Sequence, residues 1–324
     1  MQEIRNAVTA RLKDLLSSGE VTKALGYGAG EFFYDNTPTV FNDADSAEGF
    51  VYDSFCGGNL SKYLIANNVV EGKTAVVLKP CDTYSMNQLM SEFRVRRENV
   101  HIIGVDCKGM VDIEKVKARG IKGITSITEA DGILTVNTIY GAETVAKSEV
   151  LLEKCMSCRG KKHMVYDELI AEVDGELTLD NNRFDMVDKL DNMTSKERFE
   201  FWQTELSKCI RCNACRNACP ACSCRKCVFD NAKSGVAAKA NSDEFEEKLF
   251  HIIRAFHVAG RCTDCGECSR VCPQNIPLHL LNRKFIKEIN GLYGDYQAGE
   301  NTEPGSPLTS FTKEDCDPSV VSDR

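Results

Sequence analysis

Cysteine is the residue type whose number and spacing in this chain point most directly to chemistry. The 324 residues contain 17 cysteines, and eleven of them lie between positions 209 and 272. The N-terminal residues lack the charged, apolar and small-residue blocks of an export signal, so we expect a reducing environment in which thiols stay free. Dense cysteine under those conditions predicts metal binding rather than a disulfide framework.

The motif Cys-x2-Cys-x2-Cys-x3-Cys-Pro occurs twice in the second half of the chain. Three thiolates at this spacing can wrap one iron–sulfur cube, while the fourth cysteine ligates the other cube. Zinc is the alternative, although it rarely uses eight cysteines in a doubled pattern. We therefore predict two 4Fe-4S clusters with exchanged fourth ligands. The first-motif group is Cys209, Cys212, Cys215 and Cys272, and the second-motif group is Cys262, Cys265, Cys268 and Cys219.

Four cysteines of the first half form a third candidate set, which we call the α/β group: Cys81, Cys107, Cys155 and Cys158. Cys81 and Cys107 each follow a short apolar run that reads as a buried strand. The carboxyl ends of parallel strands are where open α/β sheets keep their sites. Cys155-x2-Cys158 could complete four ligands. Buried free cysteine is the alternative, but the arrangement favours a third 4Fe-4S cluster.

Three further cysteines follow the first motif in the pattern Cys222-x-Cys224-x2-Cys227. Three cysteines within six residues are too many for a packing role. They could bind another cluster or a zinc ion, and we favour the cluster because the neighbouring chain already carries iron–sulfur motifs. The distant Cys56 is our candidate for the fourth ligand.

The two motifs differ in local charge. Residues 209–227 contain four cations and no carboxylate, whereas residues 262–272 contain two carboxylates and one arginine. Positive neighbours stabilise the reduced, more negative form of a cluster. We therefore expect the first-motif cluster to have the higher reduction potential.

The elements that must position these cysteines follow from apolar periodicity. Residues 1–18 predict an amphipathic helix, and Gly26–Gly30 reads as a turn. Strands at Thr74–Leu78 and Val100–Val105, with a helix over Thr83–Arg97 between them, predict a parallel pair with a crossover. Asp131-Gly132 predicts a hairpin.

These elements indicate an α/β domain over residues 1–185 and a mainly α domain over 186–295. Thr194 and Glu197 have the spacing of a capping box at the start of a helix, and helices are also expected over 246–259 and 278–293. Residues 296–324 lack an apolar period and predict an extended tail.

Composition excludes two classes of protein. The 40 basic and 48 acidic residues give a formal charge of −8, which argues against a nucleic-acid binder. No uninterrupted apolar run reaches the roughly 18–20 residues of a membrane span. We expect a soluble, cytoplasmic protein.

Several segments resemble a known family. CGGNLSKYL (56–64), VVLKPCDTYSMNQLMSEFRVRRENVHIIGVDC (76–107) and CMSC (155–158) resemble the beta subunits of deazaflavin-linked hydrogenases and formate dehydrogenases. CIRCNACRNACPACSCRKC (209–227) and the segment 255–285 resemble the dicluster module fused to that domain in one branch. Residues 186–295 also resemble the helical-ferredoxin domains of respiratory and heterodisulfide-reductase subunits.

The resemblance implies an electron-relay subunit of an anaerobic, heteromeric oxidoreductase, with a 4Fe-4S cluster on the α/β group. Expected partners are a flavoprotein, ferredoxin, or a hydrogenase or dehydrogenase subunit, in complexes that include electron-bifurcating ones. Many members bind FAD, for which Gly57, Gly58 and Asn59 are the candidate phosphate cradle, with loop glycines as the alternative.

Three functions follow from this reading. The first is an electron-transfer subunit with three or four 4Fe-4S clusters. The second is an oxidoreductase subunit that itself binds FAD and reacts with a soluble electron carrier. The third is a zinc-stabilised or redox-sensing scaffold.

Overall fold

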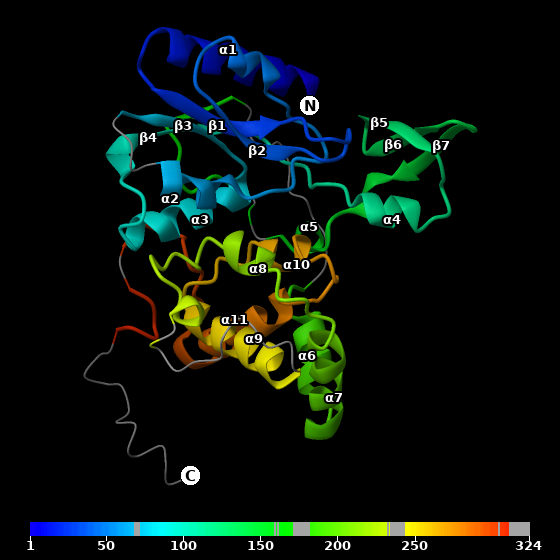
Figure 1. Cartoon of the computed structure of the whole chain (residues 1–324), viewed down its shortest axis with the longest axis vertical. Helices are drawn as coiled ribbons and strands as arrows, with labels where there is room; N and C mark the ends of the chain where they lie inside the picture. The colour runs from blue at the N-terminus through cyan, green and yellow to red at the C-terminus, as the bar shows by residue number, and fades with distance from the viewer. Residues whose placement is uncertain are drawn as a thin grey trace.

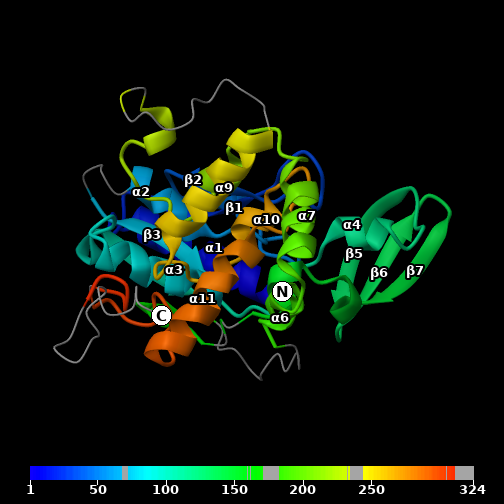
Figure 2. The same ribbon diagram turned by 90° about the horizontal axis from the view of Figure 1, so that it is seen from below.

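The computed structural model describes residues 1–67, 72–158, 160, 162–170, 182–231, 233, 244–303 and 305–310. Figure 1 shows an α/β part that contains the N-terminus, with the helices of the second half stacked against it. A small separate sheet projects from the side of the α/β part, as Figure 2 shows from below.

A five-stranded sheet forms the centre of the α/β part, in the order β2-β1-β3-β4-β8. The β1–β3, β3–β4 and β4–β8 pairs are parallel, and β2 returns antiparallel to β1. Both β3 and β4 are buried at every position, as expected for strands covered on two faces. The strands are β1 (Lys23–Gly28), β2 (Thr37–Phe41), β3 (Thr74–Leu78), β4 (Val100–Gly104) and β8 (Glu168–Leu169).

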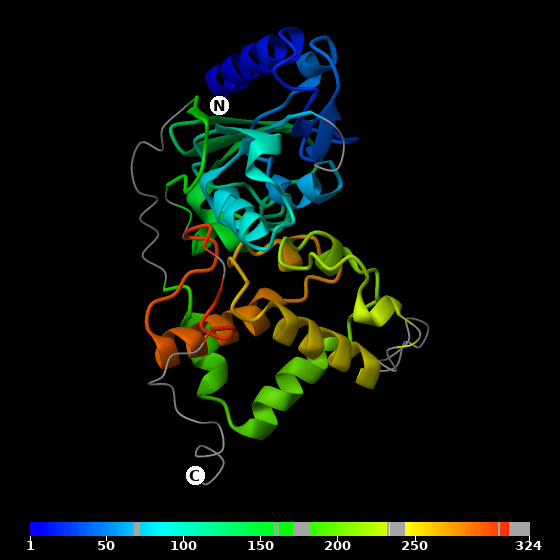
Figure 3. The same cartoon turned by 90° about the vertical axis from the view of Figure 1, so that its left-hand side faces the viewer.

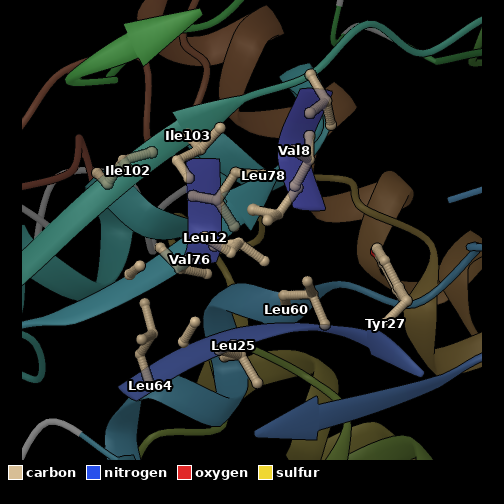
Figure 4. Close-up of a cluster of buried hydrophobic side chains, with 14 of the residues drawn as sticks. Val8, Leu12, Leu25, Tyr27, Leu60, Leu64, Val76, Leu78, Ile102 and Ile103 are labelled. Atoms are coloured by element: carbon tan, nitrogen blue, oxygen red, sulfur yellow. The ribbon is translucent and has the colours of Figure 1, made fainter. Parts of the chain in front are cut away.

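Helices cover both faces of this sheet. The helix α1 (Gln2–Ser17) buries Val8, Leu12 and Leu15 on one face, as its periodicity predicts. The short α2 (Leu64–Asn67), which follows a 3-10 turn at Leu60–Tyr63, and α3 (Pro80–Ser91) lie on the other face. Figure 4 shows side chains of α1, β1, β3 and β4 gathered in one apolar core.

The projecting sheet has three antiparallel strands, β5 (Ile124–Ala130), β6 (Ile133–Thr138) and β7 (Gly141–Ala146). The predicted hairpin is confirmed, since Asp131 and Gly132 form its turn with φ of 48° and 75°. The helix α4 (Ile113–Lys117) precedes the sheet, and α5 (Glu153–Met156) follows it.

Among its described residues, the second half contains four longer helices and two short ones. They are α6 (Asp185–Asp191), α7 (Ser195–Leu206), α8 (Ala214–Asn217), α9 (Glu244–Val258), α10 (Glu267–Arg270) and α11 (His279–Tyr293). The capping box is confirmed: the Glu197 N–H donates to Thr194 Oγ1 over 3.3 Å, and the Thr194 N–H donates to Glu197 Oε2 over 2.8 Å. Figure 3 shows that α8 and α10 lie on the side nearest the α/β part.

Two sequence-based expectations need correction. The segment Gly26–Gly30 is expected to form a turn, but its first three residues belong to β1, which ends at Gly28. A Cβ atom at Gly26 would lie 2.8 Å from the Phe50 ring, so this glycine serves close packing within a strand. The helix predicted over Thr83–Arg97 is α3, which begins earlier because Pro80 occupies its first turn and ends at Ser91.

The beginning of the predicted tail packs against the rest of the chain. The Tyr296 hydroxyl donates to the Gly260 carbonyl over 2.8 Å, and the Asn87 amide donates to the Gly299 carbonyl over 3.1 Å. Residues 296–303 are thus bound to both halves of the molecule. Cys316 and the rest of 311–324 lie outside the described residues.

Candidate metal centres

The α/β group converges at the carboxyl edge of the main sheet. Cys81 lies in the first turn of α3, directly after β3, and Cys107 follows the end of β4. Burial raises the pKa of Cys107, and the charges of Cys81 and Cys155 raise it further. Cys158 shares a thiol–thiol hydrogen bond with Cys81, which lowers the pKa of Cys81. The four cysteines of the α/β group therefore lie near one another in the structure.

A repeated local hydrogen bond prepares several of these sulfur atoms to carry negative charge. The N–H two residues after the cysteine donates to its Sγ: Gly160 to Cys158 over 3.3 Å, and Arg211 to Cys209 over 3.4 Å. Hydrogen bonds to the charged form of a group favour that form, and the thiolate is the metal-binding form of cysteine. Gly109 and Asp264 make the same backbone contact with Cys107 and Cys262.

A buried lysine lies beside the α/β group. Lys79 is 1% exposed, and its ammonium group donates to the Gly58 carbonyl over 2.8 Å and pairs with Asp82 at 2.9 Å. Burial alone would lower the pKa of Lys79, but Asp82 and the thiolates of Cys81 and Cys107 raise it above its usual value. The side chain therefore stays charged and provides a fixed positive charge next to these thiolates.

The two motifs of the second half adopt the same unusual backbone. Arg211 and Asn213 have φ of 54° and 62°, and the equivalent Asp264 and Gly266 have φ of 58° and 67°. Non-glycine residues seldom adopt the left-handed region, and it recurs at functional sites. Each pair leads into a short helix, α8 or α10, that carries the third cysteine of its motif. The shared curl turns backbone N–H groups towards the sulfur atoms.

The fourth cysteine of each motif lies with the opposite motif. Burial raises the pKa of Cys215, and Cys272 is the first of the neighbouring thiolates that raise it further. Burial likewise raises the pKa of Cys265, with Cys219 as the next contributor. Cys272 and Cys219 therefore each lie near a cysteine of the opposite motif.

Buried polar atoms around these cysteines fit an inorganic cluster. Arg254 is 4% exposed, and within the described chain its Nε has no hydrogen-bond partner. The His251 Nε2 lies 3.2 Å from the Cys209 Sγ, and the Asn282 amide nitrogen lies 3.8 Å from the Cys268 Sγ. Buried donors without acceptors are costly, and cluster sulfides would provide acceptors here. The donor set therefore fits iron–sulfur centres.

An ion triad joins the α/β group to the second-motif group. Lys154, next to Cys155, donates to Glu267 over 2.5 Å, and Glu267, next to Cys268, also accepts from Arg270 over 2.8 Å. Glu267 is 2% exposed. Burial would raise its pKa, but Arg270 and Lys154 hold that pKa well below its ordinary value.

Charges from distant residues modify the sequence-based comparison of the two motifs. Asp264 lies 2.7 Å from Arg283 and 3.5 Å from Arg183, while Glu267 is paired by Lys154 and Arg270. Both carboxylates counted in residues 262–272 are therefore neutralised. The difference in local charge between the motifs is smaller than the sequence suggests.

The group predicted from Cys222, Cys224, Cys227 and Cys56 is only partly assembled. The first three line one cavity, whereas Cys56 is 0% exposed in the core of the α/β part. Burial raises the pKa of Cys56 to about 12, and its Sγ lies 3.5 Å from the Asn36 amide nitrogen. Cys56 as fourth ligand is thus a correction: it packs as a small apolar residue at the turn before α2.

The three candidate flavin residues are buried and engaged with this chain. The Gly57 carbonyl accepts from Lys154 over 2.5 Å, and the Gly58 carbonyl accepts from Lys79. The Asn59 side chain accepts from the Ser61 N–H and donates to the Ser85 hydroxyl. Their carbonyls thus anchor the lysines beside the α/β group, which is a role that the sequence analysis missed.

Sequence reasoning also missed Lys79, Lys154 and Arg254, although two of them carry a local signal. Lys79 lies two residues before Cys81 and Lys154 lies one residue before Cys155. A lysine beside a predicted thiolate is a candidate counter-charge. Arg254 is far from the motifs in sequence, so only the packing of α9 reveals it.

No helix in the described part of the chain is long and apolar enough to cross a membrane. Within the same residues, no three His, Cys, Asp or Glu side chains are arranged to hold a single metal ion.

Comparisons with known proteins agree with this architecture. Residues 205–276 match the family model of a 4Fe-4S dicluster domain. The beta subunit of an F420-dependent formate dehydrogenase from Methanocaldococcus jannaschii is 24% identical, over 93% of this chain and 94% of its own length. The beta subunit of F420-dependent formate dehydrogenase 1 from Methanococcus maripaludis is also 24% identical, over 89% of this chain and 90% of its own.

A solved structure of the F420-reducing nickel–iron hydrogenase complex from Methanosarcina barkeri matches 48% of this chain and 62% of its own chain. The identity is 14% and the TM-score is 0.36. The assignment therefore depends on the two sequence relatives and the dicluster match. This chain is a homologue of F420-dependent formate dehydrogenase beta subunits, and it carries a 4Fe-4S dicluster domain in its second half.

Proposed function

We propose that this protein is an iron–sulfur electron-transfer subunit of a multi-subunit flavin-dependent oxidoreductase. The observation that carries the proposal is the repeated left-handed curl at both motifs, which presents N–H groups to two sets of cysteines. Clusters bound there would supply one-electron transfer. The first-motif, second-motif and α/β groups are the proposed ligands of three 4Fe-4S clusters.

Charged residues that lie between the three cysteine groups support the proposal that the three clusters lie near one another. The ion pair of Lys154 and Glu267 connects the α/β group with the second-motif group. Burial would lower the pKa of Arg254, but the charges of cysteines in both motifs raise it. The buried cations Lys79, Lys154 and Arg254 offset the negative charge of thiolates and sulfides. These contacts support the proposal that the α/β domain and the dicluster domain hold their clusters close together.

The exchange of fourth ligands is tested by Cys219→Ser and Cys272→Ser. The first variant is expected to perturb the second-motif cluster and the second variant the first-motif cluster. Low-temperature EPR of the reduced protein distinguishes the two clusters. If Cys219→Ser perturbs only the first-motif cluster, the proposed ligand sets are wrong. If the wild-type protein shows no iron–sulfur signal on reduction, the proposed function is wrong.

An apolar groove between α6, α7, α9 and α11 supports association with other subunits. Its volume is about 520 Å³, and Phe199 and Phe256 at its edge are 61% and 62% exposed. Exposed apolar surface of this kind marks interaction sites. The partner we propose is a flavoprotein subunit of the complex, and the expected result is a 1:1 or larger heteromer in native mass spectrometry of the purified complex.

A second candidate function, with FAD bound to this chain, is favoured by a cavity between the halves. The cavity has a volume of about 450 Å³ and is lined by Gly57, Tyr34 and Phe55, by the cations Lys154 and Arg270, and by the carboxylates Asp112, Glu114 and Glu153. Its aromatic walls suit a planar ligand. One flavin per isolated chain, lost in Tyr34→Ala, supports this candidate, and a flavin-free chain with full iron content rules it out.

A further inference from the structure

Three of the five cysteines that remain after the ligand sets are assigned share a cavity of about 490 Å³. Cys222, Cys224 and Cys227 line it from the segment between α8 and α9. Residues of α9 form another wall, and Lys62 reaches it from the α/β part. The cavity is therefore built from both halves of the molecule.

Positive charge dominates the lining. Arg216 pairs with Asp230 at 2.9 Å, and Asp230 is the one carboxylate among the described lining residues. Arg261 is paired with Glu92, which lies outside the lining. The cations of the lining are Lys62, Arg216, Arg225, Lys226, Arg254 and Arg261. A cavity with this excess of cations is suited to an anionic occupant.

Each thiol faces a cation. The Cys227 sulfur accepts a hydrogen bond from Arg216, and the charges of Cys222 and Cys224 reach Arg261 and Lys62. The Lys62 ammonium also donates to the Cys222 carbonyl over 2.5 Å, which fixes the chain at the first of these cysteines.

Arg254, which also lies near cysteines of both motifs, adds a buried donor to this cavity. It is 4% exposed, lines the cavity, and donates from one guanidinium nitrogen to the Cys215 carbonyl over 3.1 Å. Its Nε has no hydrogen-bond partner among the described residues. A sulfide of a cluster in this cavity could accept from such a donor. Three thiolates at about 2.3 Å from a single zinc ion would occupy only a small part of a cavity of about 490 Å³.

We propose that this cavity holds a fourth 4Fe-4S cluster, bound by the thiolates of Cys222, Cys224 and Cys227. This inference rests on the proposed function, since it requires a chain that is loaded with iron and sulfide. Cys56 is not a ligand of this cluster, because it lies in the α/β core. The thiols of Cys222 and Cys219 are hydrogen-bonded to each other, so the new centre adjoins the second-motif group.

The test is the full chain purified without oxygen, with Cys222, Cys224 and Cys227 all changed to serine. Iron and acid-labile sulfide are expected to fall by about four atoms each per chain, because one cube contains four of each. The EPR signals of the other clusters should remain. The matched control is Cys56→Ala, which is expected to keep the iron content of the wild type.

Unchanged iron in the triple variant overturns the proposal, and so does a loss of zinc in place of iron. If the triple variant fails to fold, Cys224→Ser alone is measured, since Cys224 is exposed. That variant is expected to lose or alter one EPR signal, and an unaltered set of signals overturns the proposal. A wild-type chain without iron would instead refute the proposed function, so the two failures are distinguishable.

Discussion

The two halves of the molecule position their cysteines by different physical means. In the α/β part, the cysteines of the α/β group lie at the ends of elements that pack into one large apolar core. In the second half, cysteines themselves form much of the core: Cys215 and Cys268 are buried in the same cluster as Leu206, Phe229 and Phe250. The α/β group is thus attached to a core that is formed mainly by other side chains, whereas cysteines of the two motifs are themselves part of the core of the second half.

This difference teaches which half depends on metal for its stability. A structural metal contributes its binding free energy directly to folding where the apolar core is small. The α/β part buries side chains of α1 and its strands in one large apolar cluster, of which Cys56 and Cys155 are minor members. The second half has several small apolar clusters instead.

The largest expected effect therefore comes from removing iron. Chelation under anaerobic conditions should abolish protection from hydrogen exchange in α8 and α10, while β3 and β4 keep theirs. The reason is that β3 and β4 are buried at every position by apolar contacts. Hydrogen–deuterium exchange with mass spectrometry measures both regions in one sample. Equal loss of protection in the two halves, or equal retention of it, would show that they do not differ in their dependence on iron.

Lys154→Met tests the junction between the halves. Breaking a buried ion pair costs about 3–5 kcal/mol, and we expect the lower end because Arg270 still pairs with Glu267. Removing this charge beside Cys155 should also lower the reduction potential of the α/β cluster. Chemical denaturation and an EPR-monitored redox titration give the two quantities.

The control for this variant is Lys117→Met, which removes an exposed partner of Glu114. Surface pairs of this kind contribute little to stability. A Lys154→Met protein as stable as the Lys117→Met protein would show that the triad does not hold the halves together.

Acid should destabilise the second half through His279. Burial, followed by the charge of Arg283, lowers the pKa of His279 to about 3, against about 6.5 in an unfolded chain. The unfolded state thus binds more protons below pH 6.5, and stability falls by about 1.4 kcal/mol per pH unit as pH decreases. His279→Asn should flatten the change in melting temperature between pH 7 and pH 5. An unchanged slope would mean that His279 is not the responsible group.

The smallest effect concerns the two clusters of the dicluster domain. The first-motif cluster is expected to have the higher reduction potential, but only by a small margin, because Asp264 and Glu267 are neutralised by distant cations. Arg283→Met should widen the margin by exposing the charge of Asp264 to the second-motif group. A redox titration in which this variant narrows the margin would contradict the electrostatic account.

Many helices and strands can be predicted from the sequence because they depend on patterns of neighbouring residues. β3 matches the predicted strand at both ends, and α9 and α11 begin and end within two residues of expectation. β1 was missed because its glycines read as a turn, whereas they allow the Phe50 ring and Thr39 to approach the strand. Close packing against another segment leaves no local signal.

The cysteine groups can likewise be predicted where they depend on local spacing, but not where they depend on packing between distant segments. The spacing within each motif predicts three thiolates around one cube, and both motifs share a left-handed curl that the spacing alone does not indicate. The exchange of fourth ligands between the motifs stays a prediction. Cys56 was misassigned because counting cysteines cannot reveal that one of them faces the α/β core. The triad of Lys154, Glu267 and Arg270 was equally hidden, since Lys154 and Glu267 are far apart in the chain.

The most direct test of the account is elemental analysis of the chain purified without oxygen. Iron, acid-labile sulfide, zinc and flavin are measured per polypeptide. Three cubes require about 12 iron and 12 sulfide atoms, and the fourth raises both to about 16. Either result supports an iron–sulfur electron-transfer subunit. Zinc without acid-labile sulfide would contradict the central claim.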